Sequence, residues 1–174
     1  MWAAQSLKLK QGQRYYTSGG LAPMGFSMPV AIGAAFSEQS KTIYAITGDG
    51  GFHIAVQSVM LVAQYDLSVK IIVMNNHALG MITQFQHLYF DDRMEGTTSE
   101  GGYVVPDIRK IAEGCGLSYF YLNEQLLADV NLKSRIAKCR NCVVEYVIQG
   151  LTTVSPKLEY NKPIDRPSPQ VEEK

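Results

Sequence analysis

The segments TIYAITGDGG (residues 42–51) and VKIIVMNN (residues 69–76) decide the fold of this chain. Each begins with β-branched and apolar residues, as buried strands of a parallel sheet do. Between them, residues 52–65 place apolar side chains at helical spacing, so the region predicts a strand, a helix and a second strand. A polar motif follows each strand. Because ligands bind at the carboxyl edge of open α/β sheets, we expect both motifs to lie together at that edge.

The two motifs have the chemistry of a diphosphate and metal site. Gly48, Gly50 and Gly51 allow the backbone to approach an anion closely, and the helix that follows directs its free N–H groups and positive dipole end to the same place. Asp49 offers a carboxylate oxygen, and an asparagine of the second motif offers an amide oxygen. With a backbone carbonyl, two phosphate oxygens and a water molecule, these ligands approach the octahedral shell that Mg²⁺ prefers.

Other nucleotide-binding motifs fit these segments less well. A dinucleotide fingerprint needs a third glycine where His53 stands, and an acidic residue after the second strand, where this chain has two asparagines. A P-loop needs Gly-Lys-Ser/Thr, which neither motif contains. Taken singly, Gly-Asp-Gly-Gly is usually a tight turn, and Asn-Asn at a strand end is usually a turn or a cap. Their pairing across one strand–helix–strand unit is what favours the diphosphate site.

Further blocks accompany these motifs in a fixed order. They are MWAAQ (1–5), TSGGLAPMGFSMP (17–29), AIGAA (31–35), GMITQFQ (80–86) and PDIRKIAEGCG (106–116). Together with residues 48–76 they resemble the C-terminal, cofactor-diphosphate-binding domain of thiamine-diphosphate enzymes, specifically of the acetolactate synthase-like group. The resemblance covers roughly residues 1–122.

The resemblance implies roles for individual residues. Mg²⁺ would be bound by the side chains of Asp49 and Asn76 and by the backbone carbonyl of Ala78. Met24 would contact the aminopyrimidine ring of the cofactor, and Phe85 stands where biosynthetic acetolactate synthases usually carry a tryptophan at the substrate channel. The full set of implied cofactor-binding residues is Ala22, Met24, Gly48, Asp49, Gly50, Gly51, Asn76, Ala78, Leu79, Gly80 and Met81.

The resemblance also implies an activity and what this chain lacks for it. Such enzymes decarboxylate a 2-oxo acid such as pyruvate and transfer the two-carbon unit to a second carbonyl, as transferases or lyases. The glutamate that activates the cofactor lies on a pyrimidine-binding domain, and no residue here takes its role, so this chain contains no catalytic residue and is expected to be inactive alone. We expect that domain in the same longer chain or on a separate subunit.

Several alternatives stay open at this point. The chain is either half of such an enzyme or a non-catalytic relic or assembly module of the same fold, and the reaction is either carboligation or that of a 2-oxo acid decarboxylase or oxidase. FAD is possible in the full-length enzyme, in a middle domain, but nothing in this chain supports it. By resemblance, the complete protein is expected to be a homodimer or tetramer.

The remaining periodicity predicts one α/β domain over residues 1–150. We expect a doubly wound, mainly parallel sheet of about six strands with helices on both faces, as in the thiamine-diphosphate-binding fold. Residues 118–122 and 142–148 are expected to be the last strands. Helices are expected at residues 1–9, 28–37, 107–114 and 124–138. Beyond Gly150 the chain becomes proline-rich, so residues 151–174 are expected to be an extended or disordered tail, either a solvated end or a lid or strap.

Composition excludes other classes of function. The chain has 16 basic and 16 acidic residues and no net charge, so it has no electrostatic footprint for nucleic acid or an anionic membrane. Its apolar runs are too short to span a bilayer. Three cysteines and no secretory segment indicate a reduced, cytoplasmic setting. Cys139 and Cys142 invite a redox or zinc interpretation, but no second Cys or His pair completes a zinc shell.

Overall fold

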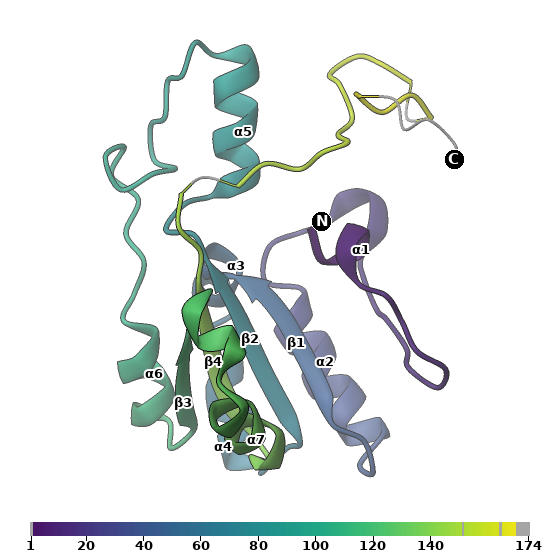
Figure 1. Ribbon diagram of the computed structural model, residues 1–174, viewed down its shortest axis with the longest axis vertical. Helices are drawn as coiled ribbons and strands as arrows, with labels where there is room; N and C mark the ends of the chain where they lie inside the picture. Colours follow the sequence, from purple (N-terminus) through teal and green to yellow (C-terminus); the bar gives the residue numbers. More distant parts are fainter. Residues whose placement is uncertain (1, 151, 164, 170–174) are drawn as a thin grey trace.

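The computed structural model describes residues 2–150, 152–163 and 165–169, and its centre is a parallel sheet (Figure 1). The strands are β1 (Ile43–Gly48), β2 (Val69–Asn75), β3 (Ser118–Leu122) and β4 (Cys142–Val147), in the order β1-β2-β4-β3. All neighbouring strands are parallel. The predicted α/β fold class is therefore confirmed.

The sheet of the described residues has four strands, fewer than the six expected. The reason lies in the sequence on either side of it. Residues 7–25 are polar or glycine-rich, and the described residues after 150 are rich in proline, so neither region offers an apolar, β-branched run that can join a buried sheet.

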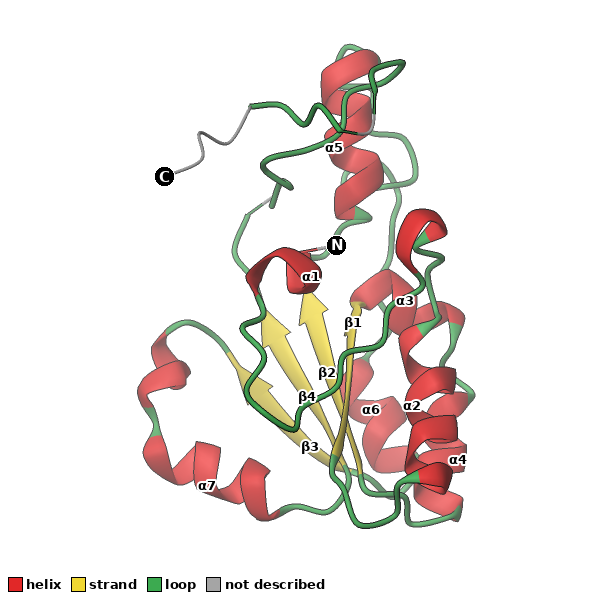
Figure 2. Ribbon diagram, turned by 90° about the vertical axis from the view of Figure 1, so that its right-hand side faces the viewer, coloured by secondary structure: helices red, strands yellow, loops and turns green. Residues whose placement is uncertain are grey.

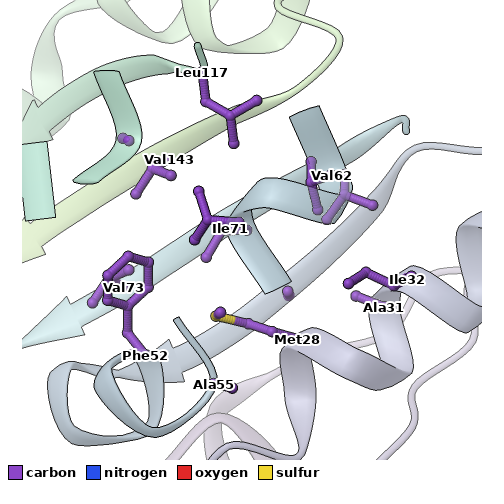
Figure 3. Close-up of a cluster of buried hydrophobic side chains, with 14 of the residues drawn as sticks. Met28, Ala31, Ile32, Phe52, Ala55, Val62, Ile71, Val73, Leu117 and Val143 are labelled. Atoms are coloured by element: carbon purple, nitrogen blue, oxygen red, sulfur yellow. The ribbon is translucent and has the colours of Figure 1, made fainter. Parts of the chain in front are cut away.

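Helices cover both faces of the sheet, as predicted (Figure 2). One face carries α2 (Ser27–Ser37), α3 (Asp49–Ile54), α4 (Ser58–Gln64) and α6 (Ile108–Gly114). The main core lies between these helices and the sheet, where Met28 and Phe52 approach Ile71 and Val73 of β2 (Figure 3). Each fully buried side chain of this size stabilises the fold by about 1.5–3 kcal/mol relative to exposure.

The opposite face carries a single helix of the described residues, α7 (Val130–Lys138). Its Leu132 and Ile136 pack on a smaller cluster of Phe120, Cys142 and Val144. Alternate residues of β4 therefore serve different clusters, since Val143 belongs to the main core and Val144 to the smaller one. This two-sided burial explains why β4 is almost continuously apolar at its start.

The single helix expected at residues 52–65 is two helices in the structure. A tight turn at residues 55–57, with Ser58 N donating to Ala55 O at 2.9 Å, separates α3 from α4. The turn lets Phe52 of α3 and Val59 of α4 both reach full burial. Because the sheet is twisted, one straight helix could not keep its apolar side chains against the sheet along its whole length.

Two other expected helices are also shorter than their periodicity suggested. Residues 124–138 form a 3₁₀ turn, η2 (Gln125–Ala128), and then α7. Asp129 has extended backbone and accepts a hydrogen bond from Leu132 N at 2.9 Å, so it caps α7 and ends the continuous helical pattern. At the N-terminus a helix was expected at residues 1–9, but α1 (Trp2–Ser6) ends at Ser6 and residues 7–9 are not helical.

Several segments gather beyond the carboxyl ends of the strands. Figures 1 and 2 show α1 and α5 (Gly80–Tyr89) above the tips of the strands, with the C-terminal segment running past both. Trp2 Nε1 donates to Thr153 O at 3.1 Å, which joins α1 to that segment. The short turn η1 (Gly19–Leu21) precedes α2. No helix among the described residues is both long and apolar enough to cross a bilayer.

Candidate functional site

The two polar motifs lie side by side at the carboxyl edge of the sheet. Gly48, the last residue of β1, is the register partner of Met74 in β2. Asp49 therefore begins α3 directly opposite the point where the chain leaves β2 through Asn75 and Asn76. The proximity that the sequence predicted is present, and the parallel register is its cause.

Asp49 is the most unusual polar residue at this edge. Its side chain is buried, with 2% exposure, and its Oδ2 has no hydrogen-bond partner. Burial raises the pKa of the Asp49 carboxyl above its ordinary value, while its own amide, the Tyr103 hydroxyl, the Gly50 amide and His77 act in the opposite direction. An ionised carboxylate held this way is costly unless a cation binds it. The buried, unpaired carboxylate of Asp49 is therefore suited to binding a metal ion.

At three glycine positions around Asp49, an added side chain would force neighbouring atoms to move. A Cβ on Gly50 would lie 2.6 Å from Leu79 Cδ2 and 2.7 Å from Met24 Cε. A Cβ on Gly51 would collide with Thr47 Oγ1, and one on Gly80 would lie 2.8 Å from Asn76 Nδ2. The contact between Gly50 and the Leu79 side chain shows that the first motif lies against the loop that follows the second.

The second motif contains two asparagines with different surroundings. Asn75 has 1% exposure and donates from Nδ2 to Glu145 Oε1 at 2.6 Å, while its Oδ1 accepts from His77 N at 2.9 Å. Both ends of its amide are therefore engaged within the fold. Asn76 is half-buried and makes longer hydrogen bonds of 3.3 Å, from Ala78 N to Oδ1 and from Nδ2 to Thr152 Oγ1. This contrast favours Asn76 as the more available ligand.

The loop after Asn76 is constrained on both sides. His77 has a positive φ of 54°, a left-handed conformation that is uncommon for a residue with a side chain. Ala78 is buried and forms an antiparallel bridge with Thr98, and Leu79 N donates to Thr97 O at 2.9 Å. The carbonyl predicted to ligate the metal thus belongs to a residue whose backbone is fixed by a distant segment.

The other predicted residues lie around this centre. Ala22 has a left-handed φ of 42°, and Met24, two residues later, approaches the Gly50 position. Met81 lies in the first turn of α5. Phe85, further along the same helix, packs in an aromatic cluster with its ring centroid 4.7 Å from that of Tyr89. The roles assigned to these side chains in cofactor and substrate binding remain predictions.

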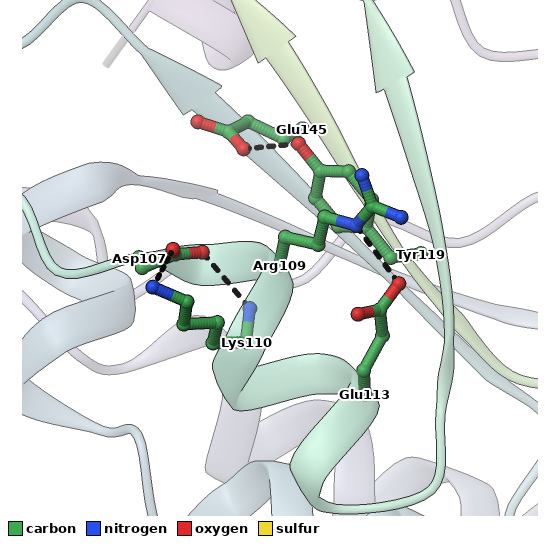
Figure 4. Close-up of polar contacts among 6 residues, drawn as sticks. All are labelled: Asp107, Arg109, Lys110, Glu113, Tyr119 and Glu145. Atoms are coloured by element: carbon green, nitrogen blue, oxygen red, sulfur yellow. Dashed lines mark hydrogen bonds and ion pairs between the residues drawn. The ribbon is translucent and has the colours of Figure 1, made fainter.

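A cavity of about 470 Å³ adjoins the motifs on the side of β4 and β3. Asn75, His77 and Tyr103 line it together with Arg109, Tyr119 and Glu145. Figure 4 shows the polar contacts of its wall: the Tyr119 hydroxyl donates to Glu145 Oε2 at 2.5 Å, and Arg109 on α6 pairs with Glu113. Most of these polar groups already have partners within the chain.

Sequence reasoning missed three residues that shape the site. Tyr103 comes from a loop without periodicity and Thr152 from the tail, so neither carried a local signal. Glu145 did carry one, because it interrupts an otherwise apolar strand, and a charge inside a buried strand usually has a partner. Its partners, Asn75 and Tyr119, come from β2 and β3.

The two cysteines of the Cys139–Cys142 pair are free, and burial raises the pKa of Cys142 to about 12. A thiol with so high a pKa is a poor nucleophile at neutral pH. Within the described ranges no group of three or more His, Cys, Asp or Glu residues could hold a metal ion. The predicted magnesium site is of a different kind, with one carboxylate, one amide and one backbone carbonyl.

Comparisons with known proteins identify the family. The family described as "Thiamine pyrophosphate enzyme, C-terminal TPP binding domain" matches residues 1–146. The chain is 35% identical over 130 residues to the acetolactate synthase large subunit of Lactococcus lactis, covering 74% of this chain and 22% of that protein. It is 39% identical over 117 residues to the acetolactate synthase of Arthrospira platensis, covering 67% and 20%.

A longer match is to the acetolactate synthase isozyme 1 large subunit of Escherichia coli K12. It is 33% identical over 156 residues, covering 90% of this chain and 27% of that protein. The chain thus spans only about a fifth to a quarter of the length of these relatives. The family match extends over most of the chain and includes both polar motifs, so this chain belongs to the C-terminal, thiamine pyrophosphate-binding domain family of thiamine pyrophosphate enzymes, and its relatives are acetolactate synthases.

Proposed function

We propose that this chain forms the diphosphate and Mg²⁺ half of the cofactor site in an acetolactate synthase-like enzyme. The enzyme would decarboxylate a 2-oxo acid and join the two-carbon unit to a second carbonyl compound. The observation that carries the proposal is Asp49, which is buried with an unpaired Oδ2 where the first motif lies against Leu79 of the loop after the second. A cation bound there would neutralise the carboxylate and receive the phosphate oxygens.

The proposed roles are those that the family resemblance implies. Asp49 and Asn76 would hold Mg²⁺ with the carbonyl of Ala78. Gly50 and Gly80 would let their backbones approach the diphosphate, and the first N–H groups of α3 and α5 point to the same edge. Thiamine diphosphate, when bound, supplies the electron sink for decarboxylation.

The half-exposed side chains near this centre would act on the rest of the cofactor and on the substrate. Met24, which lies against the Gly50 position, would support the aminopyrimidine ring. Met81 and Phe85 on α5 would border the thiazolium ring and the substrate channel. The activating glutamate would come from a pyrimidine-binding domain, in the same longer chain or on another subunit. We propose that the complete protein is a cytoplasmic homodimer or tetramer.

The first test measures cofactor binding in the assembled protein, meaning this chain together with its pyrimidine-binding domain. Asp49→Asn is expected to weaken the Mg²⁺-dependent binding of thiamine diphosphate at least about tenfold in calorimetry, because a charged ligand becomes neutral. Asn76→Ala is expected to act in the same direction. Asp66→Asn makes the same change at the amino edge of the sheet, where Asp66 pairs with Arg140, and should leave the affinity unchanged.

Unchanged affinity in Asp49→Asn would overturn the metal assignment. Product analysis with pyruvate then separates the possible reactions, since acetolactate, acetaldehyde and acetyl phosphate identify carboligation, decarboxylation and oxidation. A protein that binds the cofactor but consumes no pyruvate would be a non-catalytic module, and that result would overturn the enzymatic part of the proposal.

A further inference from the structure

Two buried side-chain oxygen atoms among the described residues lack a hydrogen-bond partner, and they lie close to each other. They are Asp49 Oδ2 and the hydroxyl of Tyr103. The Tyr103 hydroxyl lies 3.3 Å from the position that a Cβ on Gly50 would take, next to Asp49 in the chain. The hydroxyl and the Asp49 carboxyl group are thus close to each other, but no hydrogen bond joins them in the structure.

The two groups are chemically complementary. A tyrosine hydroxyl can donate a hydrogen bond, and that of Tyr103 is buried without a partner. An ionised Asp49 can only accept hydrogen bonds. A buried donor and a buried acceptor that are both unpaired cost free energy that a small rotation of either side chain would recover.

The loop that carries Tyr103 is attached to the other half of the proposed metal site. Thr97 O accepts from Leu79 N at 2.9 Å, Thr98 forms the bridge to Ala78, and Thr98 O accepts from Tyr103 N at 2.8 Å. Residues 97–103 thus hold the backbone of the Ala78 loop and present the Tyr103 hydroxyl to Asp49. This loop connects the two motifs from outside the strand–helix–strand unit that contains them.

We propose that Tyr103 is a positioning residue of the metal site: its hydroxyl donates a hydrogen bond to one oxygen of the Asp49 carboxylate and so orients the carboxylate for binding the cation. The inference rests on the proposed function, because it assumes that Asp49 is a metal ligand. Such outer hydrogen bonds fix the orientation of ligating carboxylates, and their loss typically weakens metal affinity about 10–100-fold.

The test compares Mn²⁺ binding, followed by electron paramagnetic resonance, in the assembled protein with thiamine diphosphate. Tyr103→Phe removes only the hydroxyl and is expected to weaken Mn²⁺ binding about tenfold. The kcat at saturating metal and cofactor should change less than about twofold, because the hydroxyl orients the ligand without entering the reaction. Tyr121→Phe, at an exposed tyrosine of β3, is the matched control and should bind Mn²⁺ normally.

Two further measurements distinguish the effect of the Tyr103 hydroxyl from the packing of its ring and from anchoring of the loop. If Tyr103→Phe binds Mn²⁺ normally and only Tyr103→Leu is weakened, packing of the ring is responsible and the inference is wrong. The amide of Leu79 should keep its hydrogen-exchange protection in Tyr103→Phe, because its bond to Thr97 is intact. Loss of that protection would make Tyr103 a structural anchor of the loop and would also overturn the inference.

Asp49→Asn distinguishes this inference from the proposed function. If Asp49→Asn loses Mn²⁺ and Tyr103→Phe does not, Asp49 is a ligand that needs no tyrosine, and only the positioning role fails. If neither variant changes Mn²⁺ binding, Asp49 is not a metal ligand and the proposed function fails with the inference.

Discussion

The side chain of Gln84 pairs with the backbone of Val154 through two hydrogen bonds. Gln84 Nε2 donates to Val154 O at 3.0 Å, and Val154 N donates to Gln84 Oε1 at 2.8 Å. Both residues are buried. Because Thr152 of the same segment accepts from Asn76, the pairing places the start of the C-terminal segment directly beside the proposed metal site. A role as a lid or strap remains a prediction.

Replacing Gln84 should release this segment. Gln84→Ala leaves the N–H and the carbonyl of Val154 buried without partners, so we expect the free energy of unfolding to fall by about 1–3 kcal/mol. Hydrogen exchange at Val154 should accelerate, as mass spectrometry can show. Gln64→Ala, at the exposed end of α4, is the control and should change neither quantity measurably. Unaltered exchange in Gln84→Ala would mean that other contacts hold the segment.

A methyl group at Gly50 should disturb the cofactor site without unfolding the domain. The added Cβ would meet Leu79 Cδ2 and Met24 Cε, which are the ends of flexible side chains and can move. We therefore expect Gly50→Ala to fold but to weaken thiamine diphosphate binding at least about tenfold, because a displacement of the order of 1 Å is costly at a shaped site. Calorimetry on the assembled protein measures this.

The control for that substitution is Gly33→Ala in α2. A Cβ at Gly33 has no neighbour within 4 Å, and alanine is about 1 kcal/mol better than glycine within a helix. This variant should therefore bind the cofactor normally and unfold at a slightly higher temperature. Equal cofactor affinity in both variants would show that the space around Gly50 does not matter for binding.

Glu145 is expected to stabilise the second motif by accepting a hydrogen bond from Asn75. Glu145→Ala removes the acceptor of both Asn75 Nδ2 and the Tyr119 hydroxyl, so we expect the free energy of unfolding to fall by about 2–4 kcal/mol. Exchange of the His77 amide should also accelerate, because Asn75 holds it. Glu113→Ala, on the exposed side of α6, should have little effect in the same chemical denaturation experiment. A similar fall in the free energy of unfolding in Glu145→Ala and Glu113→Ala would contradict this role of Glu145.

The stability of the domain should depend on pH through Asp107. This residue caps α6, and the hydrogen bond from the backbone N–H of Lys110, together with that from the Lys110 side chain, lowers the pKa of Asp107 below its ordinary 3.8. A carboxyl group with a lowered folded pKa contributes stability above its unfolded pKa and loses it as the pH falls through the folded value. The contribution should therefore begin to fall below about pH 4 and be lost once the pH is below the folded pKa.

Asp107→Asn isolates this effect, because asparagine keeps the cap and removes the charge. The difference in unfolding free energy between the natural chain and the variant should be present at pH 6 and vanish toward pH 2, as urea denaturation at each pH can measure. A difference that stays constant over that range would show that the charge of Asp107 makes no contribution.

Local sequence determined the strand–helix–strand unit and the identity of its motifs. Burial on both faces requires continuous β-branched and apolar runs, and β1 and β2 carry such runs directly before Asp49 and Asn75. Parallel register then brings the two strand ends together without further information. The capping residue Asp107 was also readable, because an acceptor before a helix serves its free N–H groups.

Tertiary structure alone decided which side chains complete the site. Asn75 and Glu145 lie 70 residues apart, as do Gln84 and Val154, and no local periodicity connects such pairs. The loop that carries Tyr103 is held near Asp49 by the pairing of residues 97–98 with the Ala78 loop. The sequence by itself therefore determined the two polar motifs and the edge at which they lie, since those follow from strand composition. Their hydrogen-bond partners depend on how distant segments pack, and packing is set by the whole fold.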